Sequence, residues 1–161
     1  MTGYEWYRRL THRFRANNRH GTHSPFAYAF VEQVLNRKDV SSDPLIFPAG
    51  WIPDAQERAM VAKLVKAYAC DPRIRIASEY EAGEGPMPLI VLLSPGEQFV
   101  RAAPGDIFIV PRIMRHESAF GYWRALVKDP SILLSIETNV MGLLFFRPEF
   151  LRKQHFRLKR G

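Results

Sequence analysis

Two histidines stand three residues apart in the stretch HGTHSPF, residues 20–26. His20 and His23 at this spacing could bind one metal ion together, because imidazole nitrogens are common zinc ligands. A zinc site needs three or four ligands, however, and no cysteine or acidic residue lies beside this pair. The sequence therefore favours a turn, in which Gly21 supplies an unusual backbone angle and the histidines bond carbonyl groups or contact an anion or a partner.

Two other side chains, those of Cys70 and Ser94, could act as nucleophiles. Such a nucleophile needs a base to take its proton and an acid to orient the base, and the sequence alone places neither beside them. Cys70 is expected to be a packed small residue at a helix end. Ser94 follows a buried strand, where parallel sheets bind ligands, but Ser-Pro is also a usual helix start, and the helix start is favoured.

Positive charge gathers at the two ends of the chain. The net charge is +7, with residues 1–38 and residues 147–161 each carrying +5 and the middle carrying −3. Such ends could hold phosphate, acidic protein or anionic lipid, and the alternative is that they only keep the protein soluble. The candidate contacts for an anion or a partner are Arg8, Arg13, Arg15, His20 and His23.

Aromatic residues alternate with the arginines near the N-terminus. Trp6, Tyr7 and Phe14 could stack on nucleic-acid bases, so nucleic-acid binding is kept as an alternative. No RNA- or DNA-binding module is recognisable, and a helix that packs one face on a core would show the same pattern.

Length and composition predict one folded domain. The chain has 161 residues, of which 47% are hydrophobic and 12% aromatic, enough for a core without disulfides or metals. The longest apolar runs are too short to cross a bilayer, and the first residues do not form a secretory signal. The lone cysteine fits a reducing cytoplasm, so we expect a cytoplasmic protein.

The first helix is predicted over residues 4–15. Tyr4, Tyr7, Leu10 and Phe14 recur at spacings of three and four, which is typical of an amphipathic helix whose aromatic stripe packs on the core. Most of the arginines lie off this stripe.

Two further helices have recognisable starts. Ser24 followed by Pro25 predicts an N-cap and a first-turn proline. Asp54 and Glu57 predict a capping box for the next helix. Between them, the proline-rich residues 40–55 predict a connecting loop that could cover a sheet edge. Residues 1–53 are thus expected to form N-terminal helices and a proline-rich loop, and residues 54–161 an α/β core.

The rest of the chain alternates between strand and helix patterns. Extended runs are predicted at RIRIAS, PLIVLL, IFIV, ILLSIET and MGLLFFR, with a short helix in SPGEQFVRAAPGD and a longer helix over residues 116–128. The short connection between the last two runs suits an antiparallel pair. This order predicts an α/β fold with a mostly parallel, doubly wound sheet and a C-terminal antiparallel hairpin.

Two stretches also carry a family resemblance: RHGTHSPFAYAFVEQVL at residues 19–35, and IFIV with YWRALVKDPSILLSIETNVMGLLFFR within residues 107–147. Their HG-x-HSPF turn and G-L-x-F-F-R ending resemble a group of bacterial class I S-adenosylmethionine-dependent methyltransferases. The resemblance covers about the first 38 and the last 60 residues. It implies a Rossmann-like sheet in which the last four predicted strands are strands four to seven of that fold, the last one inserted antiparallel.

The parts that would hold the cofactor depart from this family. The resemblance implies a glycine-rich loop after the first strand and an acid after the second, and neither is recognisable. Two strand-and-helix units are missing, so the fold is expected to be truncated. The remaining candidates for cofactor contact are Glu79, Gly83, Gly85 and Ser94.

Acidic residues are also missing where relatives usually have aspartates. Ser94, Pro111 and Arg112 stand at those positions, and none of them can replace a carboxylate. We therefore expect a catalytically degenerate, methyltransferase-like protein without cofactor that binds a protein partner or a second copy through the flank left by the missing strands. An active methyltransferase with a non-standard site and a nucleic-acid-binding module remain the alternatives.

Overall fold

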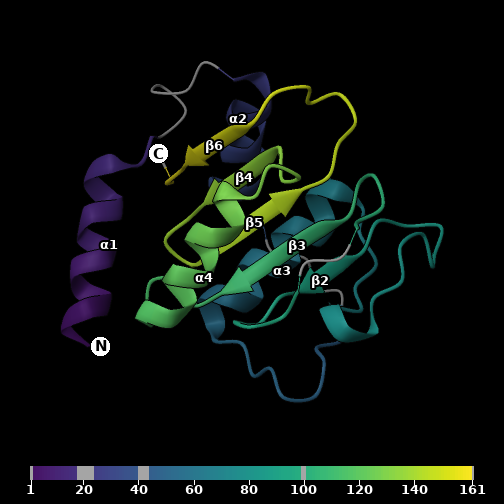
Figure 1. Cartoon of the computed structure of the whole chain (residues 1–161), viewed down its shortest axis with the longest axis horizontal. Coiled ribbons are helices and arrows are strands. Elements are labelled where there is room, and N and C mark those ends of the chain that lie inside the picture. The colour runs from purple at the N-terminus through teal and green to yellow at the C-terminus, as the bar shows by residue number, and fades with distance from the viewer. Residues whose placement is uncertain (1, 18–23, 40–43, 99–100, 161) are drawn as a thin grey trace.

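A six-stranded sheet forms the centre of the protein, which we describe from a computed structural model covering residues 2–17, 24–39, 44–98 and 101–160 (Figure 1). The strand order is β1-β2-β3-β5-β4-β6. The strands are β1 (Arg75–Ile76), β2 (Ile90–Leu92), β3 (Ile107–Pro111), β4 (Leu134–Glu137), β5 (Met141–Phe145) and β6 (Gln154–Arg157).

All strands run in one direction except β5. It lies between β3 and β4 and is antiparallel to both, while β1-β2, β2-β3 and β4-β6 pair in parallel. The predicted α/β class, with a mostly parallel sheet and an antiparallel C-terminal hairpin, is therefore confirmed. The strand β6 was not predicted, because QHFR has neither an apolar run nor a clear alternation.

Helices cover both faces of the sheet. On one face lie α2 (Pro25–Phe30), its π-helical continuation η2 (Val31–Leu35) and α3 (Ala55–Tyr68), and on the other lies α4 (Glu117–Lys128) (Figure 1). The alternation along β2 divides the core, since Ile90 and Leu92 face α3 whereas Val91 packs in the cluster around α4. The continuously apolar strands are thus explained by burial on two sides.

The predicted helix starts are confirmed. The Ser24 hydroxyl accepts from the Ala27 amide at 3.4 Å. In α3 the Asp54 carboxylate accepts from the Glu57 amide at 2.8 Å, and the Glu57 carboxylate accepts from the Asp54 amide at 2.9 Å, which completes the capping box.

The short helix predicted in SPGEQFVRAAPGD is wrong for the described residues of that segment, 94–98 and 101–106. Residues 94–97 instead form a turn, in which the Glu97 amide donates to the Ser94 carbonyl at 3.0 Å and Gly96 has a φ of +94°. Proline second and a left-handed glycine third are what a type II turn requires, so the proline serves a turn rather than a helix start.

The packing of α1 (Gly3–Arg15) reverses the prediction. Its polar face, with the buried His12, lies against the protein. Of the predicted core stripe, Tyr7 and Phe14 face outward, and Tyr4 and Leu10 are half-buried. Tyr7 is 57% and Phe14 80% exposed, and the neighbouring Trp6 is 55% exposed. The helical period fixes which residues share a face, but not which face packs.

The proline-rich loop covers part of the sheet edge at β1, as predicted. Ile46 bridges Arg73, and its amide donates to the Pro72 carbonyl at 3.0 Å while its carbonyl accepts from the Ile74 amide at 2.9 Å. The flank expected to be free for a partner is therefore occupied where the chain enters β1.

Candidate functional site

An open groove lies between α1 and the C-terminal residues that follow β6. Its volume is about 480 Å³, and it lies beside the carboxyl ends of β4 and β6, the edge at which parallel sheets bind ligands. Four of the six lining residues are Arg or Lys and none is acidic. They are Arg9, His12, Arg13, Asn139, Lys159 and Arg160.

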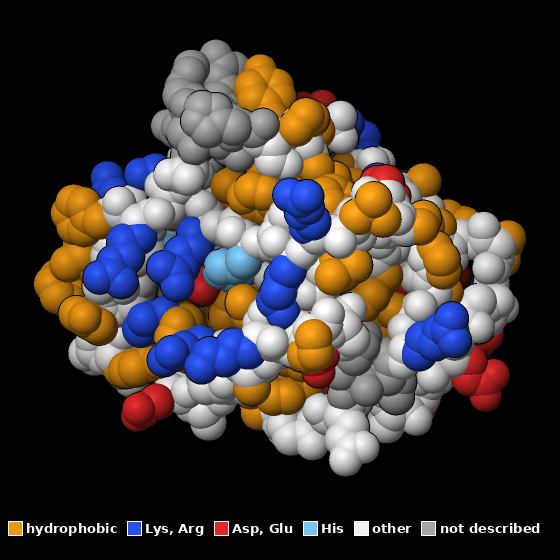
Figure 2. All heavy atoms as spheres, turned by 45° about the horizontal axis from the view of Figure 1, so that its top comes forward, with side chains coloured by type: hydrophobic (Ala, Val, Ile, Leu, Met, Phe, Trp, Pro, Cys, Tyr) orange, Lys and Arg blue, Asp and Glu red, His pale blue; other side chains and the backbone are white. Residues whose placement is uncertain are grey.

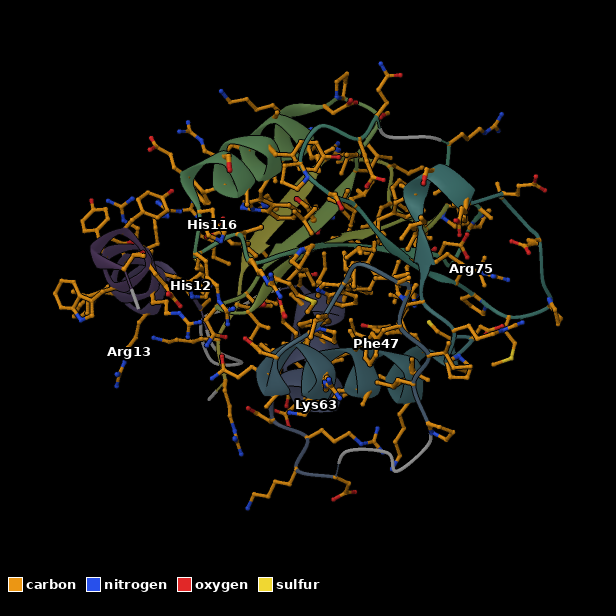
Figure 3. The ribbon with its side chains drawn as sticks, turned by 90° about the horizontal axis from the view of Figure 1, so that it is seen from below. His12, Arg13, Phe47, Lys63, Arg75 and His116 are labelled. Atoms are coloured by element: carbon orange, nitrogen blue, oxygen red, sulfur yellow. The ribbon has the colours of Figure 1, made fainter. Side chains whose placement is uncertain are left out.

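Figure 2 shows how Lys and Arg side chains gather at this end of the molecule, around a hollow in which one carboxylate and one histidine are visible. Figure 3 shows how α1 contributes: His12 points toward the sheet, whereas Arg13 points away from it. One helix thus supplies both a buried contact and a free cation.

A buried carboxylate, Glu137, forms the floor beside this groove at the end of β4. It is 3% exposed and accepts from the Trp123 indole nitrogen at 3.1 Å. The Arg157 Nε lies 3.4 Å from the same carboxylate, and Arg8 lines the small adjoining pocket. One acid is therefore shared by an indole and at least one guanidinium, and the cations beyond it in the groove are left with no acid among the lining residues.

His12 connects α1 to this floor. Its Nε2 lies 3.1 Å from the Glu137 carbonyl oxygen, which can only accept, so Nε2 donates. Burial lowers the pKa of His12, and the neighbouring Arg157 and Arg8 add to that effect against Glu137. The imidazole is therefore held in its neutral form.

Arg8 makes the second contact between α1 and the body. Its guanidinium lies 3.3 Å from the centre of the Phe120 ring in α4, a cation–π arrangement. Burial lowers the pKa of Arg8, against the raising effect of Glu137. Arg8, predicted as an anion contact, thus serves mainly to seat the helix.

Three residues here have the types of a hydrolytic triad, but not its geometry. The Ser135 hydroxyl lies 2.8 Å from His155 Nδ1, and His155 Nε2 lies 4.0 Å from Glu137. Ser135 is 2% exposed within β4, so a substrate has no access to its hydroxyl. The distance to Glu137 also exceeds a hydrogen bond, and the cluster is therefore structural.

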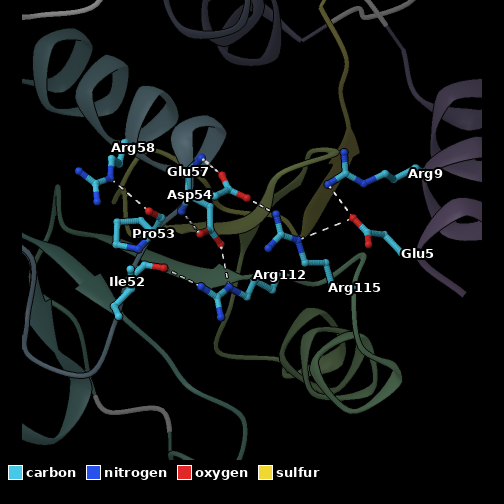
Figure 4. Close-up of polar contacts among 9 residues, drawn as sticks. All are labelled: Glu5, Arg9, Ile52, Pro53, Asp54, Glu57, Arg58, Arg112 and Arg115. Carbon is cyan, nitrogen blue, oxygen red and sulfur yellow. Dashed lines mark hydrogen bonds and ion pairs between the residues drawn. The ribbon is translucent and has the colours of Figure 1, made fainter. Parts of the chain in front are cut away.

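Next to this groove, the edge beside β3 is closed by ion pairs (Figure 4). Arg112, directly after β3, donates to the Ile52 carbonyl at 2.7 Å and lies 3.5 Å from the Glu57 carboxylate. Arg115 pairs with Asp54 and, at 3.7 Å, with Glu5 of α1. Arg112 stands where the resemblance implies an aspartate, and it binds the start of α3.

The four candidates for cofactor contact do not form one site. Gly83 and Gly85 line a cavity of about 210 Å³ at the amino ends of β2 and β3, the edge opposite to the one that binds ligands in such sheets. Ser94 lies past the carboxyl end of β2, and its amide donates to the Glu97 carboxylate at 2.5 Å. Glu79 ends a short 3₁₀ helix after β1, and it lines neither this cavity nor the cationic groove.

Tyr80 holds the chain that follows β1 against the edge of the sheet where β2 and β3 begin. Its hydroxyl donates to the Asp106 carboxylate at 2.5 Å and accepts from the Ala103 amide at 2.8 Å, while Asp106 also accepts from the Leu89 amide. Burial and the bond to Asp106 raise the pKa of Tyr80. These bonds hold the loop of Gly83 and Gly85 away from the edge where a nucleotide would bind.

Two positions at the carboxyl ends of β2 and β3 offer no free backbone donor to a ligand. The Ser94 amide already has an acceptor, and Pro111 has no amide hydrogen to offer. Arg112 brings positive charge to the position implied to hold a carboxylate. These positions therefore supply neither the free backbone donors nor the carboxylate that the resemblance implies there.

The other predicted site residues are scattered. Arg13 lines the groove, and Arg15 lines the small pocket beside it. His20 and His23 lie outside the described residues. Cys70 is buried, and burial raises the pKa of its thiol to about 12, which fits the predicted packed residue rather than a nucleophile.

Neither a metal site nor a membrane span is found in the part of the chain that the structure describes. Its His, Cys, Asp and Glu side chains form no group of three that could hold a metal ion. Its helices are likewise too short or too polar to cross a bilayer.

The sequence reasoning missed the core of the site: Glu137, His155 and Arg157. One signal was available, because Glu137 is an acid at the end of a buried apolar strand, and such an acid needs partners. Those partners come from segments far apart in the sequence, including His12, 125 residues away, and the local pattern does not identify them.

Compared with known proteins, the chain matches no protein-family model, no curated protein and no solved structure.

Proposed function

We propose that this chain is a methyltransferase-like domain without a working cofactor cradle, which acts by binding a protein partner that carries an acidic segment. The binding surface is the cationic groove beside α1. The observation that carries the proposal is the contrast along the carboxyl edge. Arginine–carboxylate pairs close it at β3, whereas in the groove only Arg9 is paired, with Glu5 at 3.0 Å, and Arg13, Lys159 and Arg160 form no ion pair with an acid of the described residues.

The strand order supports the methyltransferase-like part. An antiparallel β5 inserted between β3 and β4 is the arrangement that the resemblance implies for the last strands of that fold. The site residues support loss of catalysis, because Pro111 and Arg112 occupy positions where carboxylates would act on a substrate.

The loss of cofactor binding is tested by calorimetric titration of the full chain with S-adenosylmethionine. We expect no heat beyond dilution. The variant Arg112→Ala is expected to give the same result, because removing the side chain restores no backbone donor. A dissociation constant in the micromolar range would instead support the alternative, an active methyltransferase with a non-standard site.

The binding role is tested with a fluorescent poly-aspartate peptide as a probe for an acidic segment. Arg13→Glu is expected to weaken the interaction, whereas Lys66→Glu on α3, which has the same change in charge but lies outside the groove lining, is expected to leave it unchanged. Equal losses in both variants would reduce the effect to net charge and contradict a groove-specific site.

Nucleic-acid binding is the second candidate, favoured by the same cations together with the aromatic residues of α1. Binding through phosphates would make the affinity for single-stranded RNA fall steeply with salt. The exposed aromatic side chains lie on the far side of α1 from His12, however, so one strand would not contact both the groove floor and the aromatic face. A salt-independent or undetectable RNA interaction would remove this candidate.

A further inference from the structure

The outer face of α1 is an apolar surface that the rest of the protein leaves largely exposed. Tyr7, Leu10 and Phe14 follow one another at three- and four-residue spacings on this face, and Trp6 lies one turn before Leu10 beside them. Three of them are more than half exposed, at 55%, 57% and 80% for Trp6, Tyr7 and Phe14. A single exposed apolar residue is normal on a protein surface, but three exposed aromatic residues on one helix face, with the half-buried Leu10 between them, indicate a contact surface.

The helix keeps this face outward because its polar face is the one attached to the protein. Glu5 lies 3.7 Å from Arg115, His12 bonds the Glu137 carbonyl, and Arg8 stacks on Phe120. The Lys159 ammonium also donates to the Arg13 carbonyl at 2.8 Å. These contacts fix the rotation of α1, so the aromatic face would remain outward in solution.

Cations border this face on both sides. On the helical wheel Arg13 follows the face on one side and Arg15 follows it on the other, and both are exposed. Lys159 and Arg160 add positive charge in the neighbouring groove. The surface is therefore an apolar stripe of aromatic residues inside a positive border.

We propose that α1 binds the surface of an anionic membrane, with Trp6, Tyr7, Leu10 and Phe14 entering the interface between headgroups and acyl chains and the arginines meeting the headgroups. Trp and Tyr favour the membrane interface, and an amphipathic helix with a basic border lies in its plane. Anionic lipid complements both the apolar and the cationic part of this surface. A nucleic acid could stack its bases on the aromatic rings, but it offers no apolar phase in which Leu10 and the full width of the stripe would be buried. The proposal goes beyond the proposed function, and it holds whether or not the groove binds an acidic segment.

Tryptophan fluorescence gives a direct test on the full chain. Trp6 is the exposed tryptophan, since Trp51 is 7% and Trp123 0% exposed. Addition of vesicles of phosphatidylcholine and phosphatidylglycerol should therefore shift the emission to the blue, and vesicles of phosphatidylcholine alone should give a much smaller shift. In Trp6→Phe the spectral shift should disappear while co-sedimentation with the anionic vesicles persists.

The contribution of the apolar face is tested with a matched pair of variants. Phe14→Ser should weaken co-sedimentation about tenfold, because a largely exposed phenyl ring would no longer be buried on binding. Tyr28→Ser, at an aromatic residue on α2 that is 46% exposed, should have no effect. Both substitutions are at exposed positions, so an unchanged thermal melt would verify the fold.

The contribution of charge is tested in the same assay. Arg13→Ala should weaken binding to anionic vesicles about fivefold, and Lys66→Ala should leave it unchanged. The proposal is overturned if the protein binds neither vesicle, or if Phe14→Ser binds as well as the parent chain. It is also overturned if Phe14→Ser abolishes a dimer formed without vesicles, since a second copy would then cover the face.

Discussion

Two neighbouring stretches of the sheet's carboxyl edge use arginine in opposite ways. Beside β3, Arg112 and Arg115 are bonded to groups around the start of α3 and close the edge (Figure 4). Beside β4 and β6, Arg13 and Arg160 line an open groove in which no lining residue is acidic. Arginine closes one stretch through ion pairs with carboxylates. In the other stretch Arg9 pairs with Glu5, but Arg13 and Arg160 form no ion pair among the described residues and are able to attract an anion.

The number of basic residues in this protein therefore does not locate an anion-binding surface. That surface can be located only when it is known which of these residues form ion pairs. The basic excess at the two ends of the sequence meets in space beside α1, because Asn17 bridges Leu158 and brings the termini together. In the middle of the chain Arg112 and Arg115 are offset by acids at the start of α3, Glu57 and Asp54. Net charge by segment therefore predicted an excess of cations at the two ends of the sequence, but not where these cations gather in the fold.

The largest loss of stability is expected from a substitution at Gly142, which lies on β5 beneath the open stretch. A Cβ built on this glycine overlaps the Trp123 ring, and Trp123 in turn bonds Glu137. Gly142→Ala should lower the free energy of unfolding by about 3 kcal/mol, because the buried indole has no room to move.

Urea denaturation would measure this change. Gly121→Ala is the matched control, since Gly121 lies in α4 with no atom close to an added Cβ, and it should stabilise the protein by about 1 kcal/mol. Equal behaviour of the two variants would contradict close contact between Gly142 and Trp123.

The closed stretch should break next, through Asp54. Asp54→Ala removes the N-cap of α3 and the partner of Arg115, and should cost about 1.5 kcal/mol of unfolding free energy. Thermal or urea unfolding would measure it. Affinity for the acidic peptide should stay the same, and a loss of affinity would show that the two stretches are not independent.

A smaller change in stability is expected when the pH is lowered, and the groups responsible, His12 and His155, lie in the open stretch. Burial lowers the pKa values of both His12 and His155 below the ordinary value of 6.5. Below that value the unfolded chain binds protons that the folded chain does not, so stability should fall as the pH decreases from about 6.5 toward the folded pKa values.

Melting temperature measured against pH would show this slope, and His12→Gln should reduce it. The variant retains a side-chain donor for the Glu137 carbonyl but does not titrate. A slope that is unchanged in His12→Gln would show that His12 is not the group responsible.

The smallest change in stability is expected for Arg160→Ala in the groove, within about 0.5 kcal/mol, because the residue is exposed. Its affinity for the acidic peptide should nevertheless fall about two- to fivefold. Arg112→Ala should do the reverse, with lower stability and unchanged affinity. If both variants lose affinity equally, the distinction between closed and open stretches fails.

The parts of the fold that were predictable have local causes. Ser24 and the Asp54–Glu57 capping box identify helix starts in the sequence, because their side chains accept hydrogen bonds from backbone amides of the first helical turn. The apolar strands β2 and β3 were recognisable because burial on both faces leaves no polar position.

The parts that failed depend on partners distant in sequence. The burial of α1 is decided by Glu137 and Phe120, which no local period reveals. The strand β6 exists because the edge of β4 accepts it, although QHFR itself is half-buried and polar. The sequence Ser-Pro can start either a helix or a turn, and we predicted a helix at Ser94. The structure has a turn there, because Gly96 adopts the positive φ that a type II turn requires.

The bridge at Asn17 has a consequence for solubility. Its amide donates to the Arg157 carbonyl at 2.8 Å and its carbonyl accepts from the Lys159 amide at 3.0 Å, so it occupies hydrogen-bonding groups on the outer side of the last strand. In a shortened chain that starts at Ser24, these backbone groups of the last strand would be unpaired, and a strand from another molecule could pair with them. Light scattering from such a shortened chain should grow with concentration and time, while the intact protein stays monodisperse.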